Sequence, residues 1–230
     1  MEQNKIMIAC DFETKEELFQ FLHPFGNEKL ALKIGMELFY REGRLLVEHL
    51  KTLGHSIFLD LKLHDIPNTV AKALYNLKDL EVDYITIHAS GGSAMLKAAQ
   101  NVLTDSKTKL LAVTILTSID ETTLHNELGI TKSLTDVVCE YAKMASDNGI
   151  TGCICSPYEV KKIREFIKNP EFICITPGIR LATDSIGDQV RVATPQFAFG
   201  EGANALVIGR SITANEAPHQ RYLDIKNNKE

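Results

Sequence analysis

The sequence contains no apolar run long enough to cross a membrane, for which about 18 consecutive residues are needed. Its first residues, MEQNKIMIACDFE, reach an acidic residue too soon for a secretory signal. Basic residues are not in excess, since 25 lysines and arginines against 30 aspartates and glutamates leave a net charge of −5. This balance argues against a general nucleic-acid binder but permits a local basic pocket for one phosphate. We expect a cytoplasmic protein without nucleic-acid or membrane partners.

The five cysteines form no C-x-x-C pair, and their number is odd. Cys153 and Cys155 lie two apart in the apolar run GITGCICS, so on a strand they would share a face. A zinc site would need further ligands at a recognisable spacing, and the sequence shows none. We therefore expect reduced, buried cysteines that pack as small hydrophobic residues, and not a disulfide scaffold.

The sequence also lacks a linker, a low-complexity tract or a charge block, so we predict one domain over residues 1–230. Short apolar runs alternate with longer amphipathic stretches, a pattern typical of buried parallel strands joined by helices. The expected strands are residues 6–12, 30–35, 56–62, 83–89, 109–116, 149–156, 171–177 and 204–209. The expected helices are residues 16–25, 37–53, 67–80, 93–103, 133–147, 157–167, 194–201 and a last one from 211.

Eight strands alternating with eight helices fit either a closed (β/α)₈ barrel, the TIM barrel, or an open doubly wound sheet. The barrel is favoured because the strand count is eight and because 230 residues are close to the roughly 250 of such barrels. In addition, no G-x-G-x-x-G follows the first strand. Residues 176–194 have no clear helix or strand pattern and exceed a usual loop, so we expect a lid there.

In such a barrel the active site lies at the carboxyl ends of the strands. The residues found there are Asp11, Lys33, Asp60, Lys62, His88, Thr117, Ser118, Ser156, Gly209 and Arg210. A single charged residue after a strand is most often a solvated surface charge. Several at one barrel mouth are costly to desolvate, so we expect them to be paired or functional.

The strongest local signal is the segment DLKLHDIPNT, residues 60–69. Asp60 and Lys62 are two apart at a strand end, so their side chains should point to the same side. The carboxylate keeps Lys62 protonated, which makes it a poor Schiff-base nucleophile and a good proton donor. Asp65, in the turn that follows, either caps the next helix or takes part in the site. For His64 we expect a structural, hydrogen-bonded role.

The last expected strand ends in Gly209, and a helix begins directly after it. Backbone N–H groups and the positive end of that helix can bind an anion, where such barrels often bind phosphate. Arg210 adds a bidentate donor, and Arg180 and Gln189 of the expected lid can close over the same anion. These residues predict a phosphate site.

Five motifs occur in the order LKIGMELFY, DLKLHDIPNTV, TPGIR, DQVRVATP and VIGRSIT. Together they closely resemble the bacterial type of orotidine 5′-phosphate decarboxylase, over nearly the whole chain from Asp11 to about Thr213. The resemblance implies a TIM barrel that converts orotidine 5′-monophosphate to UMP, the last step of pyrimidine synthesis. It also implies that no cofactor and no metal are needed, and that a homodimer shares its active sites between subunits.

The resemblance further implies a role for each matching position. Lys62 would protonate C6 of the pyrimidine, and Asp60 would lie against the leaving carboxylate. Asp65 and Thr69 would be supplied by the partner subunit. The expected catalytic residues are Lys62, Asp60, Asp65 and Lys33. The expected substrate-binding residues are these four with Asp11, Ile66, Thr69, Thr117, Ser118, Arg180, Gln189, Gly209 and Arg210.

Two alternatives stand beside the decarboxylase. One is a metal-dependent sugar-phosphate lyase or aldolase of the same superfamily, which would need a carboxylate at the end of strand two, where this chain has Lys33. The other is a non-catalytic nucleotide-phosphate binder, which would be expected to lose Asp60 or Lys62 and keep its phosphate-binding residues. Both catalytic residues are present, so the decarboxylase is favoured.

Overall fold

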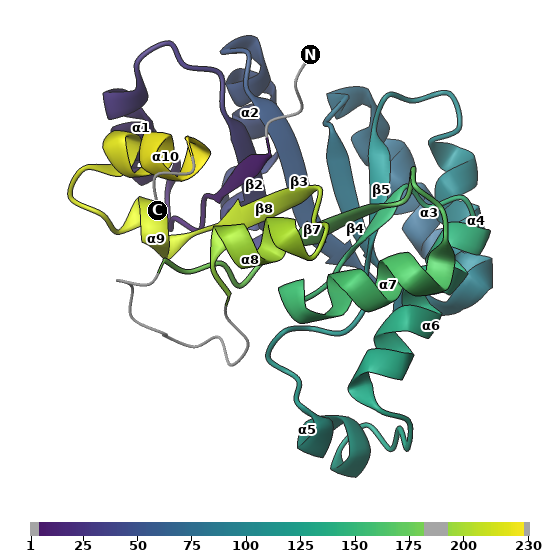
Figure 1. The fold of residues 1–230 in the computed structure, drawn as a ribbon. Helices are drawn as coiled ribbons and strands as arrows, with labels where there is room; N and C mark the ends of the chain where they lie inside the picture. Colours follow the sequence, from purple (N-terminus) through teal and green to yellow (C-terminus); the bar gives the residue numbers. More distant parts are fainter. Residues whose placement is uncertain (1–4, 182–192, 228–230) are drawn as a thin grey trace.

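The computed structural model describes residues 5–181 and 193–227. Eight parallel strands form a closed barrel, in which each strand pairs with the next along the chain and β8 pairs with β1 (Figure 1). The strands are β1 (Ile6–Ala9), β2 (Ala31–Gly35), β3 (Ser56–Leu63), β4 (Tyr84–His88), β5 (Lys109–Val113), β6 (Gly152–Ile154), β7 (Ile173–Thr176) and β8 (Ala205–Ile208). The prediction of a TIM barrel is confirmed.

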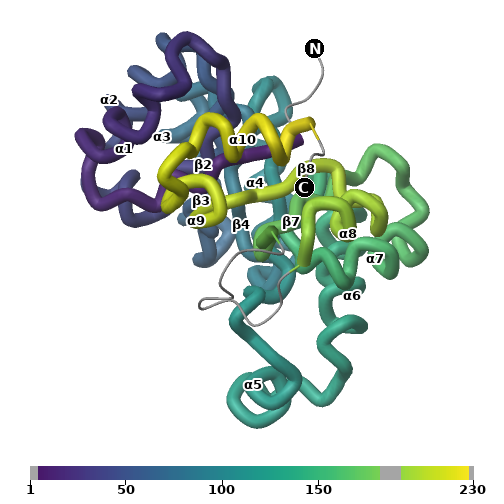
Figure 2. The backbone as a smooth tube through the Cα atoms, turned by 60° about the vertical axis from the view of Figure 1, so that its left-hand side comes forward, coloured from purple at the N-terminus to yellow at the C-terminus, as the bar shows by residue number. Residues whose placement is uncertain are grey.

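Helices follow the strands and surround the barrel (Figure 2). The α-helices are α1 (Lys15–Leu22), α2 (Met36–Thr52), α3 (Pro67–Leu77), α4 (Gly92–Val102), α5 (Glu121–Asn126), α6 (Leu134–Asp147), α7 (Val160–Ile167), α8 (Pro195–Gly200), α9 (Arg210–Thr213) and α10 (Pro218–Lys226). Short 3₁₀ helices extend this set: η1 (His23–Phe25), η2 (Lys78–Leu80), η3 (Ala89–Gly91) and η4 (Pro157–Glu159). Within the described residues, no helix is long and apolar enough to span a membrane.

Two features of the helical layer differ from the prediction. Helix α5 was not expected, and it projects away from the barrel in both views (Figures 1 and 2). It begins after Asp120, whose Oδ1 accepts a hydrogen bond of 2.7 Å from the Thr123 N–H. The single last helix is instead two, α9 and α10, because Pro218 starts a new helix at its first turn.

The core has two layers, which follow from the alternation of side chains along each strand. Met7 and Ala9 of β1 point into the barrel, where they pack with residues such as Phe58 and Val207. Their neighbours Ile6 and Ile8 point outward and pack with the helices in the larger outer layer. Except for β3, the strands are shorter than the apolar runs that predicted them, since these runs continue past the hydrogen-bonded ladder.

The predicted lid, residues 176–194, is described only at its two ends. Ile179 and Ala193 form an isolated parallel bridge. The Arg180 N–H donates to the Ala193 carbonyl at 3.0 Å, and the Ala193 N–H donates to the Gly178 carbonyl at 3.0 Å. Residues 182–192, and with them Gln189, lie outside the described part of the chain. The bridge therefore fixes where the segment leaves and rejoins the barrel.

The packing of β6 against β7 can be tested by a substitution at Gly152. It pairs with Leu111 on one side of β6 and with Ile173 on the other, and an added Cβ would clash with the Ile173 carbonyl oxygen. Because that oxygen belongs to the sheet backbone, we expect Gly152→Ala to lower the free energy of unfolding by about 1–3 kcal/mol. Gly200→Ala is the matched control, since a Cβ there meets nothing within 4 Å. Denaturant unfolding of both variants measures the difference; equal stability would contradict the packing described.

Candidate active site

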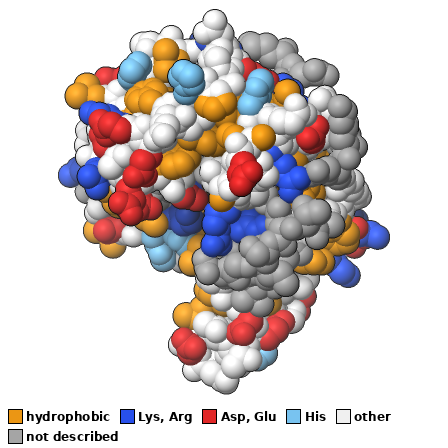
Figure 3. Space-filling model, turned by 90° about the vertical axis from the view of Figure 1, so that its left-hand side faces the viewer, with side chains coloured by type: hydrophobic (Ala, Val, Ile, Leu, Met, Phe, Trp, Pro, Cys, Tyr) orange, Lys and Arg blue, Asp and Glu red, His pale blue; other side chains and the backbone are white. Residues whose placement is uncertain are grey.

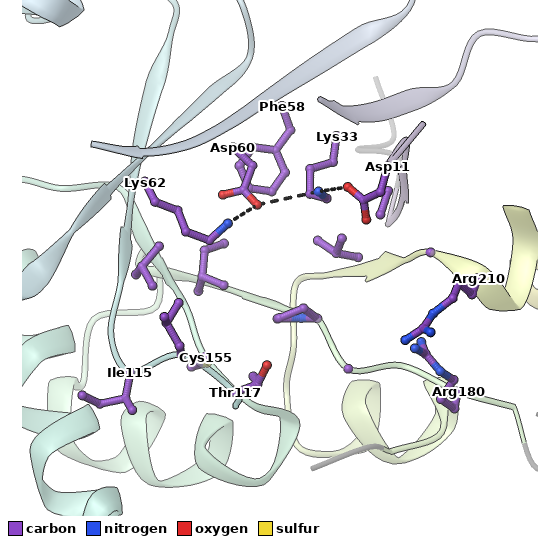
Figure 4. A pocket seen from close by; sticks show the side chains of 18 residues that line it. Asp11, Lys33, Phe58, Asp60, Lys62, Ile115, Thr117, Cys155, Arg180 and Arg210 are labelled. Carbon is purple, nitrogen blue, oxygen red and sulfur yellow. Dashed lines mark hydrogen bonds and ion pairs between the residues drawn. The ribbon is translucent and has the colours of Figure 1, made fainter. Parts of the chain in front are cut away.

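A cavity of about 270 Å³ opens at the carboxyl ends of the strands (Figure 4). It collects residues that are up to 201 positions apart in the sequence, from Ala9 to Arg210. The predicted site residues that line it are Asp11, Lys33, Asp60, Lys62, Thr117, Arg180, Gly209 and Arg210. The structure thus brings most of the predicted site into one place.

Four predicted residues do not line this cavity. Ser118 lies just past Thr117, and Asp65, Ile66 and Thr69 are exposed around the start of α3. The alternative that Asp65 caps α3 is wrong, because the cap position is Ile66 and no side chain bonds there. The Asp65 carboxylate instead accepts a hydrogen bond of 2.6 Å from the adjacent Ile66 N–H. This short local bond leaves Asp65 on the surface of its own chain.

Four charged side chains of alternating sign form a row along one wall of the cavity. Lys33 Nζ lies 2.9 Å from Asp11 Oδ1 and 3.8 Å from Asp60 Oδ2. Lys62 Nζ lies 2.8 Å from the same Asp60 oxygen. Figure 4 shows the row continuing from Asp11 through Lys33 and Asp60 to Lys62. Each carboxylate of the row is therefore bound by a lysine of the protein.

Lys33 stays charged although its side chain lies largely out of water. Burial by itself would lower the pKa of Lys33, but the carboxylates of Asp11 and Asp60 outweigh burial and raise that pKa above its ordinary value. The side chains of Lys33 and Asp60 are only 11% and 12% exposed, whereas that of Lys62 is 27% exposed. Lys62 is thus the ammonium of the row that faces the cavity most openly.

The backbone at Lys62 is not a regular strand. Lys62 has a φ of 49°, in the left-handed region that residues other than glycine seldom adopt. It lies in an irregular stretch of the β3–β4 pairing, between the pairs Leu59–Ile85 and Leu63–Ile87. Simple alternation along β3 therefore does not explain why Lys62 meets Asp60.

Thr86 of β4 holds this irregular turn, and the sequence analysis missed it. Its fully buried hydroxyl accepts a hydrogen bond of 2.8 Å from the Lys62 N–H and donates one of 2.8 Å to Asp60 Oδ1. One side chain thus fixes both the backbone of the lysine and the orientation of its carboxylate partner. The available signal was a hydroxyl inside the apolar run YITIH, which needs a partner when buried.

The histidines beside the row take a different place from the one expected. His64 is exposed, and its ring centroid lies 5.2 Å from that of His88. Within the described part of the chain, no hydrogen bond of His64 is found. Burial, followed by the nearby charges of His64 and Lys62, lowers the pKa of His88. At neutral pH this ring is uncharged and adds no cation to the site.

The inner surface of the barrel supplies the apolar part of the cavity, which the sequence analysis did not list. The additional lining residues are Ala9, Phe58, Val113, Ile115, Leu116, Ile154, Cys155, Pro177, Gly178 and Val207. Several of these are the last inward positions of their strands, so the alternation of each strand is the signal that could have identified them. Together they form an apolar surface beside the charged row.

Two arginines occupy the part of the cavity away from Lys62. Figure 4 shows the guanidinium groups of Arg180 and Arg210 close to one another. Arg180 is 9% exposed and donates to the Ile179 carbonyl at 2.8 Å. The cavity holds four cationic side chains and two carboxylates, so it carries two formal positive charges in excess. On the surface, lysines and arginines also gather in one region of the face drawn in Figure 3.

Fold and site together define a (β/α)₈-barrel protein with a charged cavity at the carboxyl ends of its strands. The chain belongs to the orotidine 5′-phosphate decarboxylase / HUMPS family, whose sequence model matches residues 4–225. The resemblance seen in the motifs is thereby confirmed over nearly the whole chain.

Individual relatives agree with this family. The orotidine 5′-phosphate decarboxylase of Bacillus mycoides (strain KBAB4) is 49% identical over 227 residues, which cover 96% of this chain and 95% of the relative. The crystal structure of the orotidine 5′-phosphate decarboxylase of Lactobacillus acidophilus matches with a TM-score of 0.87 and 40% identity, covering 98% of each chain. An uncharacterized conserved protein of Geobacillus kaustophilus matches with a TM-score of 0.86 and 38% identity, covering 98% of this chain and 100% of that chain.

The role given to Thr86 can be tested by its isosteric replacement. Thr86→Val removes the hydroxyl and leaves the Lys62 N–H and Asp60 Oδ1 without this partner. We expect a loss of about 1–3 kcal/mol in the free energy of unfolding. Thr86→Ser, which keeps the hydroxyl, is the matched control and should lose less. Urea unfolding compares the two variants. A valine variant as stable as the serine variant would show that the Thr86 hydroxyl does not stabilise this part of the site.

Proposed function

We propose that this protein decarboxylates orotidine 5′-monophosphate to UMP. The observation that carries the proposal is the row of alternating charges, with Lys62 at its open end, in a cavity that also holds two arginines. Membership of the family and the named function of the Bacillus mycoides and Lactobacillus acidophilus relatives support it. No second function has a specific observation in its favour.

The charge of the cavity suits the substrate. A phosphate monoester carries up to two negative charges near neutral pH, and the cavity has two positive charges in excess. Arg180 and Arg210 bind the phosphate in this proposal, together with Gly209 and with Gln189, which is assigned from the sequence alone. Thr117 and Ser118 bind the pyrimidine, and Asp11 and Lys33 bind the ribose.

The reaction breaks the bond between C6 and its carboxylate, so that CO₂ leaves and the electron pair stays on C6. Lys62 then gives a proton from Nζ to C6. The ammonium lies near the developing negative charge and stabilises it before the proton is transferred. Asp60 forms an ion pair with this ammonium and holds it in place, so the protein itself supplies the positive charge that an electron-withdrawing cofactor would otherwise provide. We propose that the decarboxylation itself uses no cofactor and no metal.

The phosphate lies far from the reacting carbon in this arrangement. Its binding energy can therefore appear in the rate of the reaction instead of in the affinity for the substrate. The apolar lining beside the row lowers the local dielectric constant around the ammonium, which strengthens its interaction with charge on the substrate. Both effects favour the transition state over the bound substrate.

The active form we propose is a homodimer with shared active sites. Asp65, Ile66 and Thr69 were expected in the site, yet all three are exposed and lie outside the cavity of their own chain. Large apolar side chains are also exposed on the helices that follow β2 and β3: Tyr40 is 69% and Tyr75 66% exposed. An isologous interface would bury such residues and carry Asp65 to the partner's cavity.

Two further parts of the proposal concern the whole chain. Residues 1–230 form one domain, which the continuous barrel from β1 to β8 supports. The protein works in the cytoplasm, which its five free, buried cysteines support, because such thiols suit a reducing compartment.

The central test is Lys62→Ala. Loss of the proton donor and of the charge that stabilises the carbanion should reduce kcat by more than roughly 10³-fold. The fold should persist, because Lys62 lies at the mouth of the barrel, and thermal unfolding verifies this. Lys97→Ala, at an exposed position of α4, should retain full activity in the same absorbance assay with orotidine 5′-monophosphate. Near-normal turnover of Lys62→Ala would contradict the proposed role of Lys62 as the proton donor.

The shared site can be tested by mixing two inactive variants. Lys62→Ala and Asp65→Asn homodimers should each be nearly inactive. In a mixed dimer, one site carries both changes and the other carries neither. With free exchange, half of the dimers are mixed, so activity should return to about a quarter of the wild-type value. If exchange is demonstrated by mass spectrometry and no activity returns, Asp65 serves its own subunit.

A further inference from the structure

Three cysteines meet in the wall of the barrel, outside the chemistry proposed above. Cys153 lies in β6 and pairs directly with Cys174 in β7. Cys155 follows β6 on the same face as Cys153, and its N–H donates to the Ile175 carbonyl at 3.3 Å. The three Sγ atoms all lie within 4.8 Å of one another. We call Cys153, Cys155 and Cys174 the thiol cluster.

The thiol cluster is buried in the layer between the barrel and its helices. The exposed fractions of the three residues are 0%, 1% and 0%, and none of them forms a disulfide. All three belong to the outer layer of the core, although Cys155 also borders the cavity. Among the described residues, they are the one group of histidine, cysteine and acidic side chains whose ligand atoms lie close enough for a shared metal ion.

The spacing of the sulfur atoms suits a metal ion bound by thiolates. With metal–sulfur bonds of about 2.3 Å, three ligands around one ion place their sulfurs about 3.8–4.0 Å apart. The thiol cluster already lies within 4.8 Å, so binding requires rotamer adjustment and a contraction of less than about 1 Å. The paired strands hold Cys153 and Cys174 opposite each other and so prepare most of this geometry.

A fixed positive charge lies beside the thiol cluster. The guanidinium of Arg164 donates to the Phe172 carbonyl, to the Gly202 carbonyl at 3.3 Å and to Asn204 Oδ1. The same Asn204 oxygen accepts the Cys174 N–H at 2.7 Å. Three thiolates, one divalent cation and Arg164 sum to zero charge, which a buried site requires.

From the mutual distances, the burial and the adjacent arginine, we propose that Cys153, Cys155 and Cys174 form a binding site for one thiophilic divalent cation of the Zn²⁺ and Cd²⁺ class. Thiolates select such soft cations over Mg²⁺ and Ca²⁺. The bound ion joins β6 to β7 and stabilises the folded state by an amount that grows with the logarithm of the free ion concentration once this exceeds Kd. It takes no part in decarboxylation, so the test of this site is independent of the test of the proposed function.

The experiment titrates the reduced, full-length protein with Cd²⁺ under anaerobic conditions. We expect one Cd²⁺ per chain, an ultraviolet charge-transfer band of cadmium thiolate, and a rise in the temperature of unfolding. Cys153→Ala and Cys174→Ala should each lose the band and the rise. Cys10→Ala and Cys139→Ala, which remove buried cysteines outside the cluster, are the matched controls and should keep both. A wild-type protein without the band, or a band that survives in Cys174→Ala, overturns the proposal.

A second measurement needs no variant and decides the case if the alanine variants do not fold. The wild-type protein is unfolded slowly in mild denaturant with iodoacetamide, with and without Cd²⁺, and each cysteine is followed by mass spectrometry. Cd²⁺ should slow the alkylation of Cys153, Cys155 and Cys174 more than that of Cys10. Equal slowing at all cysteines would mean general stabilisation without this site, and the proposal would fail. Decarboxylation by the untreated wild-type protein is assayed separately, so failure of the metal site is distinguished from any failure of the proposed function.

Discussion

The whole site depends on one buried carboxylate, that of Asp60, which Lys33, Lys62 and Thr86 all contact. Asp60 is 8% exposed, and one of its oxygens faces both Lys33 and Lys62 while the other accepts the Thr86 hydroxyl. A buried charge is tolerated only when its neighbours compensate it, so none of these groups can be removed without leaving another uncompensated. Lys33 is tied in turn to Asp11 at the end of β1. One network of ion pairs and hydrogen bonds thereby links the ends of strands β1, β2, β3 and β4.

Much of the barrel could be predicted from the sequence, because each buried strand is a local apolar run. All eight runs contain strands, and the charged residues at their ends meet in one cavity, as TIM-barrel geometry requires. Helix α5 was missed because its six residues are too few to show a helical period. Its cap at Asp120 is a local signal that was available.

The contacts that could not be predicted depend on pairing between strands. The left-handed backbone of Lys62 follows from an irregularity in the β3–β4 register, which no pattern within β3 reveals. The role of Thr86 depends on the same register. Cys174 likewise reaches Cys153 only because β6 and β7 pair at these residues, although they are 21 positions apart. Sequence reasoning that looked for metal ligands at a short linear spacing was therefore bound to miss the thiol cluster.

The left-handed conformation of Lys62 has a consequence for the directed evolution of this protein. Of the three described residues other than glycine with positive φ, Glu81 and Lys168 end helices, and Lys62 alone stands at the active site. Such a conformation costs a side-chain-bearing residue about 1–2 kcal/mol that glycine does not lose. Lys62→Gly would remove this backbone cost, but it would also discard the proposed proton donor and leave Asp60 without one of its two lysines. Libraries built on this barrel need a simultaneous screen for turnover, since stability and activity compete at this one position.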